Sequence, residues 1–362
     1  MRLGVAWLVV SLLWGLPREG WSRPQRPTTK DSGIASCDDL DPSSLIVAIE
    51  RELTSLRAQP LAKRVDLGRV QLSNQDYLDR LLLPIQTAAK QGKRALCQLL
   101  SRRIKLQPLA RRPGQVTAYY HPVIRGSRRQ QGSYQVPLFR RPSEESLASQ
   151  PTEAILTGAL AGHGLELVYV ESLAIALHVH IEGSATVALD DGTEVNLTTD
   201  GHNGHPYQNP LRLLRGDHRI PDDFPTAPGQ SKTQAFITAH PEVLREYWNK
   251  NPHFVFFKET PLRGTGKFGE LVAGRSVAVD PRHVPMGALL LLRTQVATQA
   301  DSSTLAGKSI ARLVLAQDTG AAIVGPGRVD LFVGSGEEAR VAAAHTSYPG
   351  ELFLLLPRRS RR

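Results

Sequence analysis

The spacing of apolar residues divides the chain into a helical part and a part built from short strands. From about residue 41 to residue 106 the apolar positions recur every three or four residues, at Leu45, Ile46, Ile49, Leu53, Tyr77, Leu78, Leu81, Leu82 and Ile85. This spacing forms one apolar stripe along a helix. Asp41 followed by Pro42 suits a helix cap and a first helical residue. The pattern therefore predicts a helical N-terminal region over about residues 37–108.

After residue 108 the apolar runs become short and are separated by Gly, Pro and Asp. Such runs predict strands. They cover residues 116–120, 174–181, 186–189, 276–279, 288–292, 310–316 and 352–356. One helical stretch interrupts them at about 231–250. The chain after the helical region is therefore predicted to be mainly β.

Two polar, Pro-bearing segments, at 140–152 and 217–231, break up the β region. They suggest the two crossings between a core domain and a domain inserted into it. We place the insertion at about residues 126–245, with boundaries good to ten residues or so.

The first residues form a segment of a different kind. Met1-Arg2 precedes an apolar run from Leu3 to Leu16, and polar, Pro-bearing sequence follows. The run is too short to span a bilayer, and with Arg2 before it the segment is typical of a secretory signal, at about residues 1–22. No Cys follows it directly, so no lipobox is seen and a lipoprotein anchor is not expected. We expect an exported protein.

Composition narrows the possible partners. The 362 residues are 41% hydrophobic, enough for one large core or two ordinary ones, and they carry a net charge of +10. The arginines occur in scattered pairs and in a basic tail at 358–362, a distribution typical of solvated faces and chain ends. Basic motifs interleaved with stacking aromatics are lacking, so nucleic acid is not expected as a partner. An anionic cell-wall polymer is more accessible to an exported protein.

The chain has two cysteines, Cys37 and Cys97. After export they could form a disulfide between the start of the mature chain and a helix, or they could stay as two thiols; the sequence favours neither. No His or Cys lies at metal-ligand spacing from either one, which disfavours zinc.

Asp318 and Asp330 are the residues most suggestive of chemistry. Asp318 closes an apolar strand-like run, and Asp330 follows a Gly-Pro-Gly turn, so either carboxylate could face open space at a strand end. Carboxylates placed in this way cleave glycosidic bonds.

Seven segments in order then resemble one family. They are Thr117-Ala118-Tyr119-Tyr120-His121-Pro122, Val136-Pro137-Leu138-Phe139, Glu182-Gly183-Ser184, residues 201–207, residues 251–257, residues 274–280 and residues 318–332. In this order and spacing the chain is similar, from about residue 113 to residue 357, to the membrane-bound lytic murein transglycosylase A family. The C-terminal part of that family is called the three-aspartate (3D) domain.

The resemblance implies a double-psi β-barrel built from residues 109–125 and 246–357, a second small β domain inserted at 126–245, and a substrate groove between them. It implies cleavage of the β-1,4 bond between N-acetylmuramic acid and N-acetylglucosamine in peptidoglycan strands, with a 1,6-anhydro ring left on the muramic acid. It implies no cofactor and no metal. The expected location is the periplasm, with association to the outer membrane and to other cell-wall enzymes as further possibilities.

The three aspartates of the family match Asp280, Asp318 and Asp330, and its acid/base residue matches Asp330. The sugar's own C6 hydroxyl serves as nucleophile, so one group can first give a proton and then take one. Such a group needs a raised pKa, supplied by a neighbouring carboxylate such as Asp318 or by an apolar wall. Asp318 could equally be structural, in an Asx-turn, and Asp280 is the most architectural of the three.

The remaining candidates concern substrate binding. Tyr119 and Tyr120 alternate on a strand, so one should face the core while the other stacks on a sugar. Ser184, Asn203 and Gln317 complete the expected substrate-binding set. His178, His180, His202 and His205 raise the question of a metal, but histidines on a β surface are more often hydrogen-bonded within the protein.

The chain departs from the family pattern at four positions where Gly or a basic residue is usual: Ala118, Ala185, Ala321 and Val324. These departures affect how the substrate is bound more than which class of reaction is catalysed. Two other functions stay open: a cell-wall glycan hydrolase, and a wall-loosening protein that binds glycan without cleaving it.

Overall fold

The computed structural model describes residues 37–57, 64–66, 71–226, 231–266, 269–299 and 305–358. The predicted signal at 1–22 and residues 359–362 of the predicted basic tail lie outside these ranges. Among the described helices, none combines the length and the apolar character needed to cross a bilayer.

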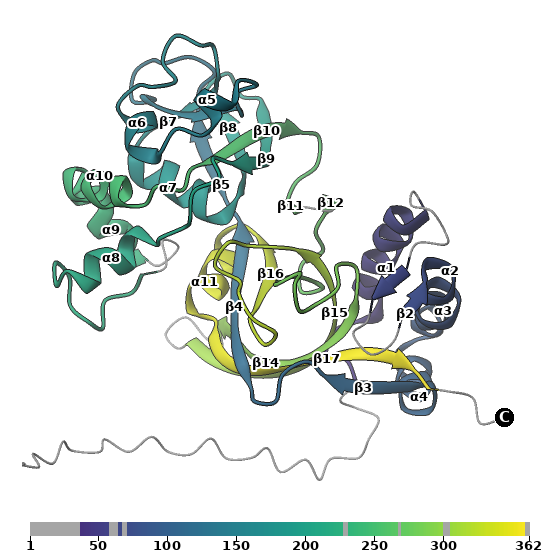
Figure 1. Ribbon diagram of the computed structural model, residues 1–362. Coiled ribbons are helices and arrows are strands. Elements are labelled where there is room, and N and C mark those ends of the chain that lie inside the picture. Colours follow the sequence, from purple (N-terminus) through teal and green to yellow (C-terminus); the bar gives the residue numbers. More distant parts are fainter. Residues whose placement is uncertain are drawn as a thin grey trace, which may run out of the picture. The chain divides into compact units, whose positions relative to one another are not determined.

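Helices fill most of the region that the apolar spacing predicts to be helical (Figure 1). They are α1 (Pro42–Arg57), α2 (Asn74–Tyr77), the π-helical turn η1 (Leu78–Leu82), α3 (Leu83–Lys90) and α4 (Lys93–Arg103), with a hairpin of β1 (Arg64–Asp66) and β2 (Gln71–Ser73) before α2. Leu45, Ile49, Leu81 and Ile85 of the predicted stripe are fully buried. They belong to the same apolar core as the large sheet described next, so the helical prediction is confirmed.

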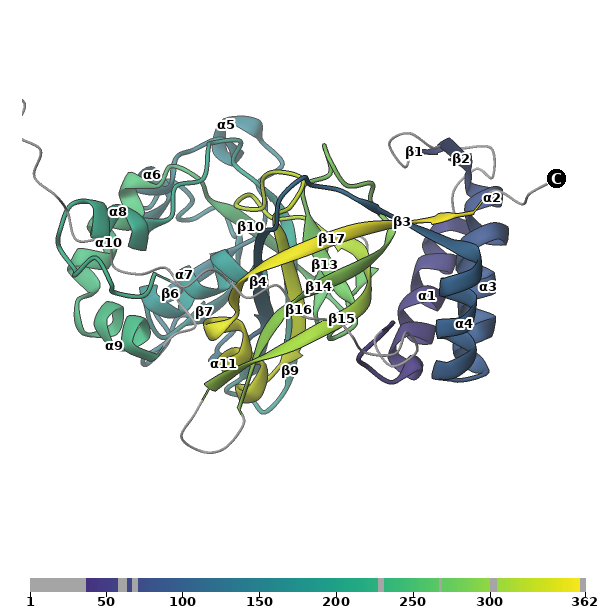
Figure 2. The ribbon, with the colours of Figure 1, turned by 90° about the horizontal axis from the view of Figure 1, so that it is seen from below.

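Seven strands form the large sheet, shown in Figures 1 and 2. They are β3 (Ile104–Pro108), β4 (Gly114–His121), β13 (Ser276–Val279), β14 (Leu289–Gln299), β15 (Leu305–Asp318), β16 (Val329–Ser335) and β17 (Ser347–Pro357), in the order β14-β15-β13-β16-β4-β17-β3. β17 also pairs with β14, which closes a ring of six strands. Helix α11 (Glu337–His345) joins β16 to β17. The double-psi connectivity stays a prediction.

A second sheet has the order β10-β9-β8-β5 and its own apolar core. Its strands are β5 (Val123–Gly126), β8 (Ser184–Leu189), β9 (Glu194–His202) and β10 (Val255–Thr260). β6 (Val136–Phe139) pairs with β7 (Glu166–Val170), and β11 (Thr265–Gly266) pairs with β12 (Gly269–Glu270). The helices are α5 (Glu145–Ala148), α6 (Thr152–Leu156), α7 (Leu173–Glu182), α8 (Pro210–Gly216), α9 (Ser231–Ala239) and α10 (Pro241–Lys250). The edge strands of this sheet reach beyond the 126–245 insertion expected from the sequence.

The prediction of a strand at 174–181 is wrong, because these residues form most of helix α7. The Ser172 side chain accepts the N–H of Ile175 at 3.3 Å and caps the helix, and Gly183 ends it with a φ of 75°. The helix is buried on several sides, so its apolar residues show no polar face that would reveal a helical period. His178 and His180 therefore lie on a helix and not on a β surface.

The other predicted strands are confirmed: each lies within an equal or longer strand, except that β14 begins at Leu289, one residue after the predicted start at 288. The predicted helical stretch at 231–250 is two helices, α9 and α10, which meet at His240-Pro241. Proline lacks the N–H needed inside a helix and suits the first turn of the next one.

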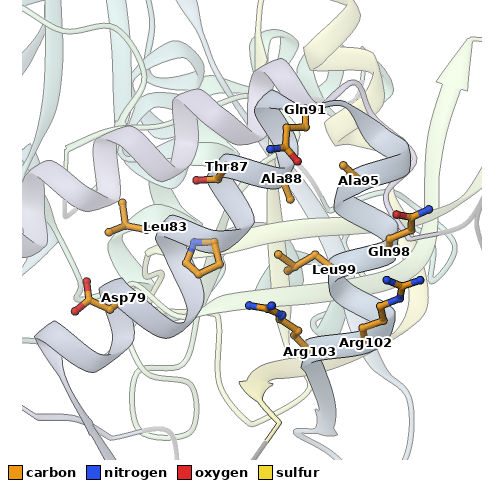
Figure 3. A pocket seen from close by; sticks show the side chains of 11 residues that line it. Asp79, Leu83, Thr87, Ala88, Gln91, Ala95, Gln98, Leu99, Arg102 and Arg103 are labelled. Atoms are coloured by element: carbon orange, nitrogen blue, oxygen red, sulfur yellow. The ribbon is translucent and has the colours of Figure 1, made fainter. Parts of the chain in front are cut away.

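A shallow groove of about 660 Å³ runs between the η1–α3 segment and α4 (Figure 3). Leu83 and Leu99 contribute apolar surface, while Arg102 and Arg103 stand at one end of it. None of the three aspartates lines this groove. It therefore lies apart from the candidate chemistry.

Covalent and ionic contacts fasten the first described residues to the rest of the protein. Cys37 and Cys97 form a disulfide with a Cα–Cα distance of 5.5 Å. The next residues, Asp38 and Asp39, pair with arginines of the large sheet region at 2.8 and 2.6 Å. Of the two states that the sequence left open for the cysteines, the structure shows the disulfide.

Replacing Cys37 and Cys97 together by serine should lower the free energy of unfolding by roughly 2–4 kcal/mol, because the bridge closes a long loop and restricts the unfolded chain. Urea unfolding followed by circular dichroism measures this difference. Reductant should bring the parent protein to the value of the double variant. A parent protein whose stability is unchanged after full reduction would contradict the prediction.

Candidate active site

Strand register brings Asp318 and Asp330 into one row. Ala278 in β13 pairs with Asp318 of β15 on one side and with Asp330 of β16 on the other. Asp330 in turn pairs with Thr117 of β4. Residues directly opposite one another in a sheet point to the same face. The two carboxylates therefore share one face of the sheet, with the small side chain of Ala278 between them.

Asp330 is a half-buried carboxyl beside a hydroxyl donor. The Oγ1 of Thr117 donates a hydrogen bond to Oδ1 of Asp330 at 2.5 Å. Burial raises the pKa of Asp330 from its ordinary 3.8 to about 6. The guanidinium of Arg328 and the Thr117 hydrogen bond oppose this rise, whereas the carboxylates of Glu182 and Asp318 add to it. Of the two causes expected from the sequence, burial is the larger and Asp318 is a minor contributor.

Asp318 holds a tyrosine in place. The hydroxyl of Tyr119 donates to Oδ2 of Asp318 at 3.0 Å, while Oδ1 accepts the N–H of Thr319 at 2.8 Å. Burial, followed by the charge of Asp318, raises the pKa of Tyr119 well above its usual value. The phenol therefore stays protonated as a donor. Its ring lies 5.3 Å from that of Phe332 between centroids.

The two tyrosines that the sequence could not distinguish have different positions. Tyr119 is half-buried and lies against Asp318. Tyr120 is 4% exposed, and its hydroxyl is bonded to Nε2 of His178 at 3.0 Å. Of this pair, Tyr119 is the one available to a ligand at the aspartates.

Asp280 anchors a loop. Its carboxylate accepts hydrogen bonds from the backbone and the guanidinium of Arg282 and, at 2.7 Å, from the N–H of Gly325. These bonds, those from the Arg282 side chain above all, hold the pKa of Asp280 far below its ordinary value. Asp280 is only 2% exposed. A permanently ionised carboxylate with filled acceptors suits the architectural role that the sequence suggested.

The other three candidates for substrate binding are buried and bonded within the protein. Ser184 contacts His121, Asn203 bonds to backbone groups of Gln150, Pro252 and Phe254, and Gln317 bonds to Ser276 and Glu52. Their exposed fractions are 7, 5 and 6%. In this structure their polar groups are bonded within the protein, and their role in substrate binding stays a prediction.

The ring of His121 joins the two sheets at the point where β4 ends. Nδ1 lies 2.9 Å from the Ser184 hydroxyl and Nε2 lies 2.9 Å from that of Thr186, both in β8. Burial lowers the pKa of His121 to about 4, with Arg263 adding to the effect. The imidazole is therefore neutral near pH 7.

Reasoning from the sequence assigned no role to Thr117 or Glu182, although both lie inside segments that carried the resemblance. A hydroxyl two residues before Tyr119 on the same strand shares its face, which is a signal for Thr117. For Glu182 the signal was its charge. The segment Glu182-Gly183-Ser184 resembles a Gln-Gly-Ser turn, in which the first residue is a neutral Gln. Within the described ranges, no group of three or more His, Cys, Asp or Glu side chains is arranged to hold a metal ion.

Comparison with known families finds two domains that match this chain. Residues 275–356 match the 3D domain, which contains all three aspartates. Residues 115–152 and 147–258 match the MltA specific insert domain. Together the two matches cover the strands that carry the three aspartates and Thr117, and most of the second sheet.

Individual relatives are of the same kind. Membrane-bound lytic murein transglycosylase A of Escherichia coli K12 is 32% identical over 248 residues, which are 67% of this chain and 65% of the relative. The crystal structure of a membrane-bound lytic murein transglycosylase from Agrobacterium tumefaciens has a TM-score of 0.71 and 26% identity, covering 88% of this chain and 94% of that one.

The Escherichia coli MltA structure with bound chitohexaose shares the fold, with a TM-score of 0.67 and 23% identity, covering 88% of this chain and 91% of that one. The chain spans about 65% of the length of the first curated relatives it matches. From the two domain matches, the relatives and the shared fold, we conclude that the chain belongs to the membrane-bound lytic murein transglycosylase A family with a C-terminal 3D domain.

Proposed function

We propose that this protein is a peptidoglycan lytic transglycosylase, a lyase that cleaves the β-1,4 bond between N-acetylmuramic acid and N-acetylglucosamine. Asp330 is its single general acid and base. The observation that carries this assignment is the burial of Asp330, which raises its pKa to about 6 and lets the protonated form persist close to neutral pH. The names of the relatives and the glycan bound to one of them support the substrate class.

In the first step, protonated Asp330 gives its proton to the glycosidic oxygen, and the bond from C1 of the muramic acid to O4 of the leaving sugar breaks. In the second step, O6 of the same muramic acid bonds to C1, and the hydroxyl proton passes to the Asp330 carboxylate. The 1,6-anhydro ring closes, water is not consumed, and Asp330 ends protonated as it began. The tethered hydroxyl replaces the second carboxylate that a hydrolase requires.

Asp318 serves this chemistry indirectly. It accepts the Tyr119 hydrogen bond at 3.0 Å and so fixes an aromatic ring beside the carboxyl row. An aromatic face next to a catalytic acid suits stacking on a sugar ring. Tyr119 is therefore our candidate for direct contact with substrate.

The proposal extends to the fold and to the location of the protein. We take the six-stranded ring as the double-psi β-barrel and the four-stranded sheet as the inserted domain, with the glycan bound in a groove between them. Because the curated relatives are described as membrane-bound, we place the protein in the cell envelope, on the periplasmic side.

Mass analysis of fragments released from purified peptidoglycan tests the function. We expect muropeptides that lack one water and have no reducing end. Reducing muropeptides alone would identify a hydrolase instead. No release from peptidoglycan that the protein still binds would identify a glycan-binding module.

A further inference from the structure

Strand β15 contains one extra residue just before Asp318. In the parallel pairing with β13, Val277 is opposite Ala316, and the next residue, Ala278, is opposite Asp318. Gln317 is therefore the residue of a β-bulge that has no counterpart on β13. With a regular register Gln317 would stand opposite Ala278, and Asp318 would fall one position further on, on the other face of the sheet. The bulge thus places Asp318 on the face that carries the proposed catalytic acid.

Side-chain hydrogen bonds hold the bulged residue at both ends of its amide. Gln317 is 6% exposed, and its Oε1 accepts a hydrogen bond from the Ser276 hydroxyl at 2.7 Å. Its Nε2 donates to Oε2 of Glu52, in helix α1, at 3.2 Å. The Ser276 oxygen in turn accepts the backbone N–H of Val272 at 2.9 Å. One end of the amide is therefore held from the large sheet and the other from the N-terminal helical region.

Glu52 is a buried carboxyl, 5% exposed. Among the residues that the structure describes, the Gln317 amide is the one hydrogen-bond donor to it. Its Oε1 lies against Gly287, where a Cβ atom would collide with it, and the N–H of Gly287 donates to the carbonyl of Ala316 at 2.7 Å. Burial raises the pKa of Glu52, as expected for a carboxyl that is costly to bury. An apolar side chain at this position would pack without that cost but would not hold Gln317.

We propose that Glu52 is a positioning residue of the active site: from the N-terminal helical region it holds the Gln317 bulge and, through it, the orientation of Asp318. Asp318 accepts the Tyr119 hydroxyl at 3.0 Å, so the contact reaches the ring that we assign to the substrate. Glu52 itself touches neither the substrate nor the reacting bond. The inference rests on the proposed function, because it concerns the placement of Tyr119 for that reaction.

The experiment compares Glu52→Leu, Glu52→Gln and Arg51→Met with the parent protein by kcat/KM on purified peptidoglycan, well below the Tm of each variant. Leucine leaves the Gln317 amide without its acceptor, so we expect a loss of about five- to tenfold, the size of one lost orienting hydrogen bond. Glutamine keeps an acceptor oxygen and should stay within about twofold of the parent. Arg51→Met removes the contacts of the neighbouring residue with Glu270 and Leu271, away from the bulge, and should keep the parent activity.

Combination with Tyr119→Phe shows whether the effect passes through Tyr119. This variant lacks the hydroxyl that bonds to Asp318, so it should lose about as much activity as Glu52→Leu. Adding Glu52→Leu to it should then cost less than about twofold more, because changes that act through one contact are not additive. An equal loss in both backgrounds would overturn the role of Glu52, since the loss would then come from a general weakening of the fold.

A second readout is independent of catalysis. In protein labelled with carbon-13 tyrosine, the Cζ signal of Tyr119 reports its hydrogen bond and is assigned by its absence in Tyr119→Phe. The signal should shift in Glu52→Leu and keep its parent position in Glu52→Gln and Arg51→Met. If Glu52→Leu does not fold, Gln317→Met removes the same hydrogen bond from the other side and should shift the signal as well.

An unchanged Tyr119 signal in the folded variant, or parent activity in Glu52→Leu, would overturn the inference. Full activity in Asp330→Asn would instead reject the proposed function and would leave the Tyr119 signal as a valid test of the bulge. The two failures are therefore distinguishable.

Discussion

Replacing Asp330 by asparagine should lower kcat/KM on purified peptidoglycan by about 10²- to 10⁴-fold, the usual contribution of general acid and base catalysis. Asparagine neither gives nor takes a proton in this pH range. Its Oδ1 can still accept the hydrogen bond from Thr117, so the local structure should persist. The rate of release of soluble muropeptides measures the effect.

Stability separates lost chemistry from lost structure in this variant. A carboxyl whose pKa is higher in the folded protein than in the unfolded chain reduces stability as pH rises from about 4 through about 6. Asp330→Asn removes that penalty, so its Tm at pH 7 should equal or exceed that of the parent. Asp318→Asn, which can still accept from Tyr119, is the matched control and should lose much less activity. An Asp330→Asn protein that is folded and fully active would reject the assignment.

Replacing Arg275 by methionine should lower the free energy of unfolding by about 3–5 kcal/mol, the usual effect of removing one partner of a buried ion pair. Arg275 is fully buried and donates to both oxygens of Asp38 at 2.8 Å. It also donates to the carbonyls of Leu313 and Asp41 and to the hydroxyl of Ser44. Without Arg275, the equally buried Asp38 loses its counter-ion. Urea unfolding, with the midpoint and the slope fitted separately, measures the change.

Two further variants define the origin of that loss. Burial raises the pKa of Asp38 and lowers that of Arg275, so each charge is unfavourably placed apart from its partner. The double variant Arg275→Met with Asp38→Leu should therefore recover part of the stability. Arg312→Met breaks the more exposed pair with Asp39 and should have a smaller effect. Equal losses for Arg275→Met and Arg312→Met would show that burial of the pair is not the cause.

The spacing of apolar residues was sufficient to predict the type of an element where one of its faces is polar. The stripe through Leu45 and Ile85 is confirmed for this reason. The run at 276–279 is buried on both faces, and its shortness and the flanking Gly274 and Pro281 indicated a strand instead. The period is lost where an element is buried on several sides, as in α7, and there the strand prediction is wrong. The caps, Ser172 and Gly183, were the better signal for that helix.

The residues of the candidate site could be named from the sequence, whereas their arrangement could not. The order of motifs pointed to the three aspartates, but only strand register shows that Ala278 lies between Asp318 and Asp330. Register depends on pairings between strands far apart in the chain, which local pattern does not encode. The same holds for Tyr119 and Tyr120: alternation says that they differ, and the surrounding elements decide which one is buried.

Strand β13 lies between the strands of the two carboxylates, and this separation determines whether they can share a proton. Asp318 and Asp330 are two inter-strand spacings apart, which puts their Cα atoms about 9–10 Å from each other. The two carboxyl groups are therefore not a hydrogen-bonded pair that shares one proton. The methyl group of Ala278 lies on the floor between them, and a bulkier residue there would occupy the space in which a sugar could meet both.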